Sequence, residues 1–404
     1  MIRLHATILF FSLSVAGWAE RFSLDSAASF AIKHNPELAA ARFNIEEARG
    51  RLLQSGRRAN PEFESEIKPN VRGREYSIGI GFVQRFPLTN RLRLEKAVSQ
   101  ADLTAAEAEV RAGELKLAAS IRALGVKWLT LQENMALKAR QVSNSKELAE
   151  VASKTAAAAE GSSVEAAQLQ LEARQLSMEI LQLEAEKATL EGEARSLLGM
   201  GSGTVDFVGS LPNPSVPGTA SPNLDSRPDY QAAQARIESA QRALDLAKAN
   251  KWEDVGVGIG AEVERSEDAP EGLETDGFVG LRFSLPLPFW NKNEGKIKEA
   301  EASAAKAEHE ANALRLAVKA EALAAIGEMK AARRILDETD GELLPLARSL
   351  EEKLATYYKQ SQPDTKLADV LRSRDKRLAI EQARLDALRA YHLARVRFES
   401  AMGR

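Results

Sequence analysis

The chain has 404 residues, a net charge of −3 and no cysteine. The absence of cysteine excludes disulfides, thiolate metal sites, cysteine nucleophiles and an acylated N-terminal cysteine. The slightly negative net charge does not indicate a surface that binds nucleic acid. Aromatic residues make up only 5% of the chain. Ala, Leu, Glu, Lys, Arg and Gln dominate its middle and end, which is typical of long packed helices. The four histidines are scattered, so a histidine-built metal site is not expected.

Residues 1–19 have the pattern of a secretory signal peptide. Arg3 and His5 precede an apolar run at 6–16, and Gly17-Trp18-Ala19 provides a small-x-small cleavage site. The run is shorter than the roughly 20 residues that a membrane anchor needs. We therefore predict cleavage after Ala19. The remaining chain has no comparable apolar stretch, so any membrane-spanning part must consist of strands.

The chain after the signal peptide contains two copies of one pattern. Residues 35–58 align with residues 227–250, where Pro36 matches Pro228 and Glu46 matches Glu238. Each copy continues with an alternating strand pair, a very long helix and a return helix that closes with glycine. The sequence thus predicts a first repeat at 20–198, a linker at 199–226 rich in Gly, Ser, Pro and Asn, and a second repeat at 227–404.

The first copy opens with a helix predicted over 25–58, which Asn60-Pro61 ends. Alternation then predicts strands at 62–68 and 76–86. In the second of these strands Tyr76, Ile78, Ile80 and Phe82 share one face, and Ser77, Gly79 and Gly81 the other. Apolar residues opposite small or polar ones are typical of a barrel strand that faces lipid.

The second copy predicts strands at 255–264 and 277–285, with an acidic loop between them at 265–276. These strands are long enough to cross a bilayer when tilted. A soluble hairpin packed on helices is the alternative interpretation.

Each strand pair precedes a very long helix, predicted over 91–158 and 293–359. At 1.5 Å per residue the first would extend about 100 Å, which indicates a coiled coil or a tubular assembly. Return helices are predicted over 164–198 and 366–402.

Four strands cannot close a barrel, and free sheet edges are not tolerated in lipid. The chain must therefore pool strands with copies of itself. Two copies would give eight strands and a filled interior, whereas three would give twelve strands and a lumen. The predicted fold class is therefore helix-dominated with a transmembrane β-barrel, in which four strands per protomer contribute to a trimeric twelve-stranded barrel on a long α-helical periplasmic tunnel.

Several motifs together resemble the TolC family of outer-membrane efflux channels of Gram-negative bacteria. They are the signal peptide, the Asn-Pro-Glu-Leu start at 35–38, the duplicated hairpins, the PLPFWNKNEGKIKEA passage at 286–300 and the terminal Leu197-Leu198-Gly199. The passage at 286–300 is most similar to the heavy-metal and cation efflux branch. Unlike many members, this chain lacks the acylated N-terminal cysteine.

The resemblance implies a homotrimer in the outer membrane, in contact with its lipid and extending into the periplasm. It also implies a periplasmic adaptor (membrane fusion) protein and an inner-membrane pump of the resistance–nodulation–division (RND) type as partners. The expected function is a passive conduit that exports small solutes or metal cations from the periplasm in a tripartite system. No cofactor is expected, and the sequence has neither a phosphate loop nor a nucleophile–His–acid set, so it does not indicate an enzyme.

Four acidic residues flank the two helix-reversing turns. Aligning Gly199 with Gly403 (403 − 199 = 204) matches Glu160 with Asp364 and Glu165 with Asp369. In a trimer they would form negative rings that favour cations. In the resembled family such acids line the constriction, which implies this role most directly for Asp364 and Asp369. Helix capping is the alternative, since acids favour helix starts.

Four aromatic residues occur where strands meet helices. They are candidates for anchors in the membrane interface, with ordinary packing at a strand-to-helix bend as the alternative. They are Phe86, Trp252, Phe289 and Trp290.

Two other functions remain open from the sequence. An exit duct of a type I protein secretion system would use the same fold with an ATP-driven partner. A periplasmic coiled-coil scaffold without a barrel is a different class of protein.

Overall fold

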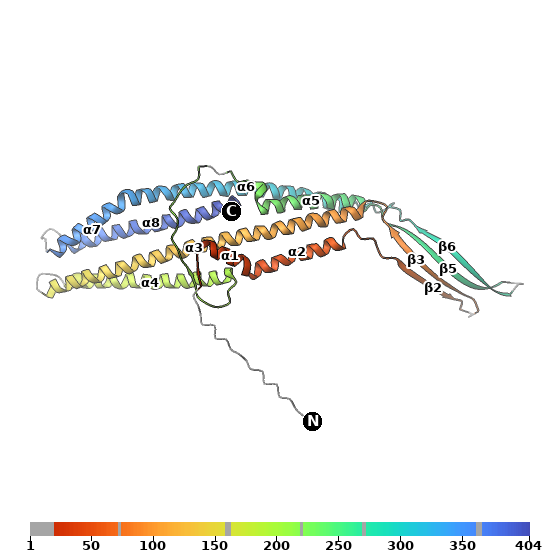
Figure 1. Ribbon diagram of the computed structural model, residues 1–404, viewed down its shortest axis with the longest axis horizontal. Coiled ribbons are helices and arrows are strands. Elements are labelled where there is room, and N and C mark those ends of the chain that lie inside the picture. Colours follow the sequence, from red (N-terminus) through yellow and green to blue (C-terminus); the bar gives the residue numbers. More distant parts are fainter. Residues whose placement is uncertain (1–19, 72–73, 158–162, 219–220, 269–271, 361–365) are drawn as a thin grey trace, which may run out of the picture. The chain divides into compact units, whose positions relative to one another are not determined.

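The computed structural model describes residues 20–71, 74–157, 163–218, 221–268, 272–360 and 366–404 (Figure 1). The predicted signal peptide lies outside these residues. The chain forms two compact units. The helical unit comprises the described residues within 20–39, 113–223 and 318–404, and the sheet unit comprises those within 40–112 and 224–317. Each unit therefore contains parts of both predicted repeats.

The sheet unit contains one antiparallel four-stranded sheet in the order β2-β3-β5-β6. Its strands are β2 (Glu62–Pro69), β3 (Tyr76–Phe86), β5 (Val255–Asp268) and β6 (Gly272–Ser284). The first two match their predicted bounds closely. The last two continue into the segment expected as a loop, with Arg265 paired to Thr275 and Asp268 to Gly272. Backbone pairing extends the hairpin there although its side chains are mostly polar.

Helices join this sheet at one end (Figure 1). They are α2 (Pro36–Gln54), α5 (Pro228–Ala249) and the first parts of α3 (Arg91–Ala157) and α6 (Glu294–Glu338). The helix α3 agrees with its prediction to within one residue. Its 67 residues continue without interruption into the helical unit.

The predicted helix over 25–58 is wrong in two respects, because it is two helices and because the second ends at Gln54. Between α1 (Leu24–His34) and α2, Asn35 is extended, with φ −66° and ψ 123°. The ring of Pro36 disfavours a helical conformation at the residue before it. The Asn35 side chain then accepts a hydrogen bond from the Leu38 N–H (2.9 Å) and donates one to the Leu197 carbonyl oxygen (3.0 Å), so the break is stabilised.

The helical unit contains α4 (Ser163–Leu198), α7 (Leu344–Lys359) and α8 (Leu367–Ala401). Both return helices end in the same way. Gly199 and Gly403 have positive φ, and the following N–H reaches back to Arg195 or Glu399. This glycine cap satisfies carbonyls that would otherwise lack partners. The glycine ends noted in the two repeats are thus equivalent.

A short parallel sheet lies in the segment expected as a linker. The strand β4 (Val205–Phe207) pairs with β1 (Glu20–Phe22). Phe207 and Trp128 are almost fully buried and their ring centroids are 5.9 Å apart, within a core that also includes Leu198. Part of the segment between the repeats therefore belongs to a hydrophobic core. A 3₁₀ turn, η1 (Leu224–Ser226), precedes α5.

The second long helix is interrupted, unlike α3. After α6 the chain makes a π-turn, η2 (Thr339–Leu343), in which the Leu344 N–H donates to the Thr339 carbonyl oxygen, and it then continues as α7. Pro345 explains the change, because it has no N–H and its ring would collide with the carbonyl four residues earlier. Widening the turn by one residue removes that conflict.

In the part of the chain that the structure describes, no helix combines the length and the apolarity that crossing a bilayer would need.

Candidate functional site

The four-stranded sheet has one apolar face, and this face is exposed. The strand register places Phe82 opposite Ile259, and Ile259 opposite Leu281. Leu281 is 86% exposed and Val279 is 80% exposed. Such a broad apolar surface is not expected in contact with water. Other exposed members of this face are Phe63, Ile67, Tyr76, Ile78, Ile80, Val257, Val263 and Phe283.

The opposite face is polar and largely lined by glycine. One row across the sheet reads Glu64, Gly81, Gly260 and Gly280. A side chain at Gly258 would come within 2.9 Å of the Phe82 carbonyl oxygen, so glycine permits the close approach of the strands there. These glycines leave a groove lined also by Glu64, Glu262 and Arg282.

Arginines partner the carboxylates at the helical end of this polar face. Arg282 on β6 pairs with Glu64 on β2, over the two glycine-bearing strands between them, and Arg85 pairs with Glu62 at 3.2 Å. The face therefore combines charged side chains with glycines, and its apolar members include Val83 and the exposed Phe278.

Both edges of the sheet lack a neighbouring strand within the described residues. The strand β2 pairs only with β3, and β6 pairs only with β5. One row of N–H and C=O groups on each edge strand is therefore available to a further strand.

An ion pair connects the two repeats where the sheet meets the helices. Arg91, the first residue of α3, binds both carboxylate oxygens of Asp254, with N–O distances of 2.8 and 2.6 Å. These hydrogen bonds raise the pKa of Arg91 above its ordinary value. Asn293 adopts a left-handed φ of 62° and its side chain donates to the Ala247 carbonyl oxygen (2.7 Å). Both contacts fix the turn between strand and helix.

The four predicted anchor aromatics lie on different sides of this junction. Phe86 continues the apolar face of β3, and the Arg58 guanidinium carbon is 5.9 Å from its ring centroid. Phe289 and Trp290 form an edge-to-face pair, and Trp290 is 96% exposed. Trp252 instead lines a groove together with Arg282 of the polar face. The anchor role stays a prediction for all four.

Two of the four predicted pore acids, Glu160 and Asp364, lie outside the described residues. Glu165, in the first turn of α4, accepts a hydrogen bond from the Tyr358 hydroxyl at 3.2 Å. Burial, with the charge of Glu165, raises the pKa of Tyr358 to about 12. Asp369 accepts from the Lys366 N–H at 3.3 Å, as a helix-capping acid does. Their role as pore rings is not tested by these contacts and stays a prediction.

A buried arginine near the start of α8 was not anticipated from the sequence. The Arg374 side chain on α8 is 1% exposed and pairs with Glu172 on α4. Burial raises the pKa of Glu172 even though Arg374 opposes the shift. Lys359 on α7 also binds Glu147 on α3, at 2.8 Å. These pairs connect helices of different repeats, and no local sequence signal identifies them.

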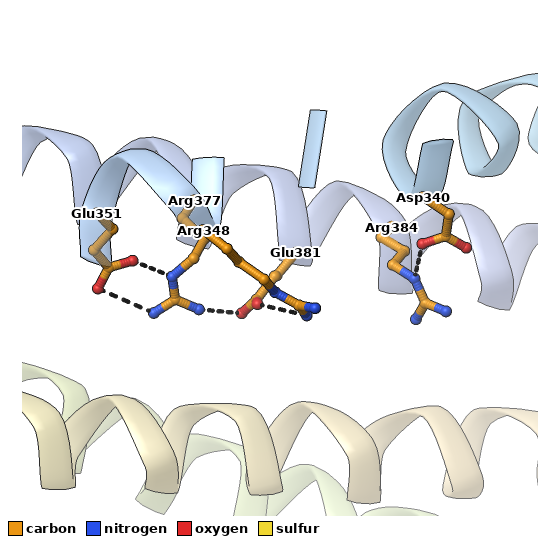
Figure 2. A network of polar contacts seen from close by, with 6 residues as sticks. All are labelled: Asp340, Arg348, Glu351, Arg377, Glu381 and Arg384. Carbon is orange, nitrogen blue, oxygen red and sulfur yellow. Dashed lines mark hydrogen bonds and ion pairs between the residues drawn. The ribbon is translucent and has the colours of Figure 1, made fainter. Parts of the chain in front are cut away.

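A network of ion pairs joins α7 to α8 and was also missed (Figure 2). Arg377 binds Glu351 on α7 and, at 2.9 Å, Glu381 on its own helix. Glu381 also pairs with Arg348 at 3.3 Å. The side chains of Arg377, Glu351 and Glu381 are only 10–16% exposed. The two carboxylates raise the pKa of Arg377, although its burial acts in the opposite direction.

One further pair of the network reaches the π-turn. Arg384 on α8 binds Asp340 within η2, and Figure 2 shows this pair separate from the other four residues along the helices. The ion pairs of α8 therefore extend from α7 as far as the interruption of the second long helix. Within the described ranges, no three His, Asp or Glu side chains gather in a way that could hold a metal ion.

Comparison with known proteins gives consistent matches. Residues 220–404 match the family model described as Outer membrane efflux protein. The predicted resemblance to the outer-membrane efflux family is confirmed. A curated relative is the Cobalt-zinc-cadmium resistance protein CzcC of Cupriavidus metallidurans, which is 22% identical over 337 residues, covering 80% of this chain and 76% of CzcC.

Solved channel structures share the fold. CusC matches with a TM-score of 0.79 and 15% identity, over 94% of this chain and 92% of CusC. The outer membrane protein VceC from Vibrio cholerae matches with a TM-score of 0.74 and 18% identity, over 94% of this chain and 96% of VceC. The expected helix-dominated fold is thereby confirmed. The outer-membrane location and the efflux function predicted from the sequence agree with the family match.

Proposed function

We propose that this protein is the outer-membrane channel of a tripartite efflux system and acts as a passive trimeric conduit. The observation that carries the proposal is the four-stranded sheet, which has an exposed apolar face, a glycine-lined polar face and two free edges. The apolar face suits lipid and the polar face suits a lumen. A soluble hairpin packed on helices would bury the apolar face instead of exposing it.

Three copies complete the sheet. In lipid the free N–H and C=O groups of β2 and β6 need partners, so each β2 pairs with β6 of a neighbouring copy. Two copies would give eight strands and a filled interior, whereas three give twelve strands and an open lumen. The small residues at Gly81, Gly258 and Gly260 favour the open arrangement.

The conduit supplies no energy of its own. A periplasmic adaptor and an inner-membrane pump of the RND type are therefore the proposed partners. The relative CzcC is named for cobalt, zinc and cadmium resistance. Metal cations are accordingly the proposed cargo class. The acids at Glu160, Glu165, Asp364 and Asp369 are proposed to favour cations at a constriction formed by the helix-reversing turns.

The proposal is tested with the purified full-length mature protein. Its mass in detergent is measured, and its conductance is recorded in planar bilayers. A trimeric mass with discrete, cation-preferring channels supports the conduit. A water-soluble, elongated species that does not conduct would overturn it and favour the periplasmic scaffold.

A further inference from the structure

Exposed cations surround the end of α2, next to the apolar face of the sheet. Arg57 and Arg58 follow the helix, and the Arg58 guanidinium lies over the ring of Phe86. A side chain on Gly56 would come within 3.3 Å of the Cβ of Lys96, so Lys96 lies beside this segment. None of the ion pairs found among the described residues involves these three cations, which are all exposed.

The second repeat presents a cation and aromatic rings at its corresponding junction. Trp290 is 96% exposed and Phe289 is 69% exposed. Lys292 follows two residues later and is exposed, and it too takes part in no ion pair of the described chain. Its neighbour Asn293 turns inward to the Ala247 carbonyl. We refer to Arg57, Arg58, Lys96 and Lys292 as the basic collar.

The other end of the apolar face has the opposite charge. Beyond Val263 the hairpin of β5 and β6 carries Glu264, Glu267, Glu274 and Asp276. They are opposed there by Arg265 and by Arg74, which pairs with Glu267 at 3.5 Å. The apolar face is thus bordered by cations at its helical end and mainly by carboxylates at its hairpin end. In a bilayer these borders would meet different leaflets.

We propose that the basic collar binds the headgroups of anionic phospholipids in the leaflet nearest the helices, with phosphatidylglycerol as the representative ligand. This inference rests on the proposed function, because it needs the apolar face to lie in a membrane. Arginine and lysine extend their charged ends to headgroups while their stems cover apolar surface. Exposed aromatic rings also favour the headgroup region of a membrane. A cationic side chain in that region is stabilised by the negative charge of anionic lipids.

Trp290 reports directly on the lipid beside the collar. The test uses the full mature chain with Trp252→Phe. Among the described residues Trp290 is then the exposed tryptophan, because Trp128 is only 1% exposed. The protein is reconstituted in phosphatidylcholine vesicles that contain dibrominated phosphatidylglycerol or dibrominated phosphatidylcholine, and quenching of its fluorescence is titrated. We expect brominated phosphatidylglycerol to associate about fivefold more strongly, the factor that roughly 1 kcal/mol corresponds to.

The collar variant removes the four charges: Arg57→Gln, Arg58→Gln, Lys96→Gln and Lys292→Gln. Its preference for phosphatidylglycerol should fall close to one, as should that of the unmodified collar in 1 M salt. A control variant removes four exposed charges on α6 and should keep the preference. It carries Lys306→Gln, Arg315→Gln, Lys319→Gln and Lys330→Gln.

The outcomes separate the two proposals. Equal quenching by both brominated lipids, or a preference that survives in the collar variant, would overturn the collar as a headgroup site and leave the channel intact. If neither lipid quenches Trp290, the apolar face is not in the membrane and the proposed function itself fails. Quenching of the collar variant by dibrominated phosphatidylcholine shows that this variant still inserts into the membrane.

Discussion

The long helices occupy corresponding places in the two repeats and differ in their continuity. The helix α3 runs from Arg91 to Ala157 as one element, whereas its counterpart changes to the π-turn η2 and resumes as α7. Pro345 is the local cause. Its aligned position in the first repeat (345 − 204 = 141) is Gln141, which keeps a backbone N–H. We therefore attribute the interruption to a single residue without an N–H.

The contacts made by the two return helices differ as well. On α8, Arg377 and Glu381 form a nearly buried ion-pair network with α7. Between α3 and α4 the core is mainly apolar, with Leu131 and Leu190 among its members. The helix pair α7 and α8 thus contains more buried charge pairing than the helix pair α3 and α4, although α8 also packs an apolar core against α6 that includes Met329 and Tyr391. The two helix pairs should therefore respond differently to charge removal, backbone changes and pH.

The largest effect should come from Arg377→Ala. Removing one member of a buried pair leaves the carboxylates of Glu351 and Glu381 uncompensated, which typically costs about 3–5 kcal/mol. Hydrogen exchange of the α7 and α8 amides should show the loss. The matched change Lys138→Ala removes a more exposed pair with Glu179 and should cost less than about 1 kcal/mol. Equal losses of stability in both variants would contradict the contrast between the two helix pairs.

Moving the proline should move the interruption. Gln141→Pro removes an N–H inside α3 and should reduce amide protection nearby by about 3 kcal/mol. Pro345→Ala should have the opposite sign and increase protection across Thr339–Leu343. Hydrogen exchange resolved by residue measures both. If Pro345→Ala leaves the π-turn with unchanged protection, proline is not the cause of it.

Acid should lower the stability of the packing of α8 through His392. Burial, with the nearby charge of Arg395, lowers the pKa of His392 to about 4, below the ordinary 6.5. The unfolded chain therefore takes up the proton first. The stabilisation from neutral His392 is complete above pH 6.5 and is lost as the pH falls towards 4, by about 3 kcal/mol.

Substituting His392→Phe should flatten this pH dependence, which amide exchange of α8 between pH 7 and 4 can follow. The exposed His309 on α6 provides the control, because His309→Gln should leave the slope unchanged. The aligned residue of the first repeat (392 − 204 = 188) is Ala188, so α4 should show no such slope from this position. A slope that persists in His392→Phe would assign it to other groups.

The smallest effect on stability is expected at the helix-reversing end, where the readout is conductance. Asp364→Asn combined with Asp369→Asn should raise single-channel conductance and weaken cation preference, because a ring of negative charge is removed. Bilayer recordings under a salt gradient measure both. If selectivity is unchanged in the single and double variants, capping is the better account of Asp369, consistent with its bond to the Lys366 N–H.

The sequence predicted the elements with strong periodic signals. The alternation of Tyr76, Ile78 and Ile80 with small residues identified the two faces of the sheet, and the absence of proline over 91–157 identified α3. Both signals are local in the sequence and extend over many consecutive residues. Pro36 was also visible, but it was placed inside a helix because the apolar spacing continues past it.

Other features depend on contacts between distant residues. The strands β1 and β4 have three residues each, and their pairing joins Glu20 to Val205. The Arg377 network could not be separated in the sequence from solvated charges, since burial of an arginine depends on which helix packs against it. At the candidate site, the position of Trp252 in a groove beside Arg282 also depends on contacts between distant residues, so the sequence could not predict it.

The central claim is that the sheet of one copy continues into the sheet of the next. The chain has no cysteine, so introduced cysteines are its only thiols. We would place Ser65→Cys on β2 and a second cysteine at successive positions of β6 from 277 to 283, then oxidise the protein in membranes and measure its mass under denaturing conditions. Ile80→Cys, on the inner strand β3, replaces Ser65→Cys as the control. The account predicts cross-linked dimers and trimers at one register with Ser65→Cys and none with Ile80→Cys. Monomers alone at every position would contradict it.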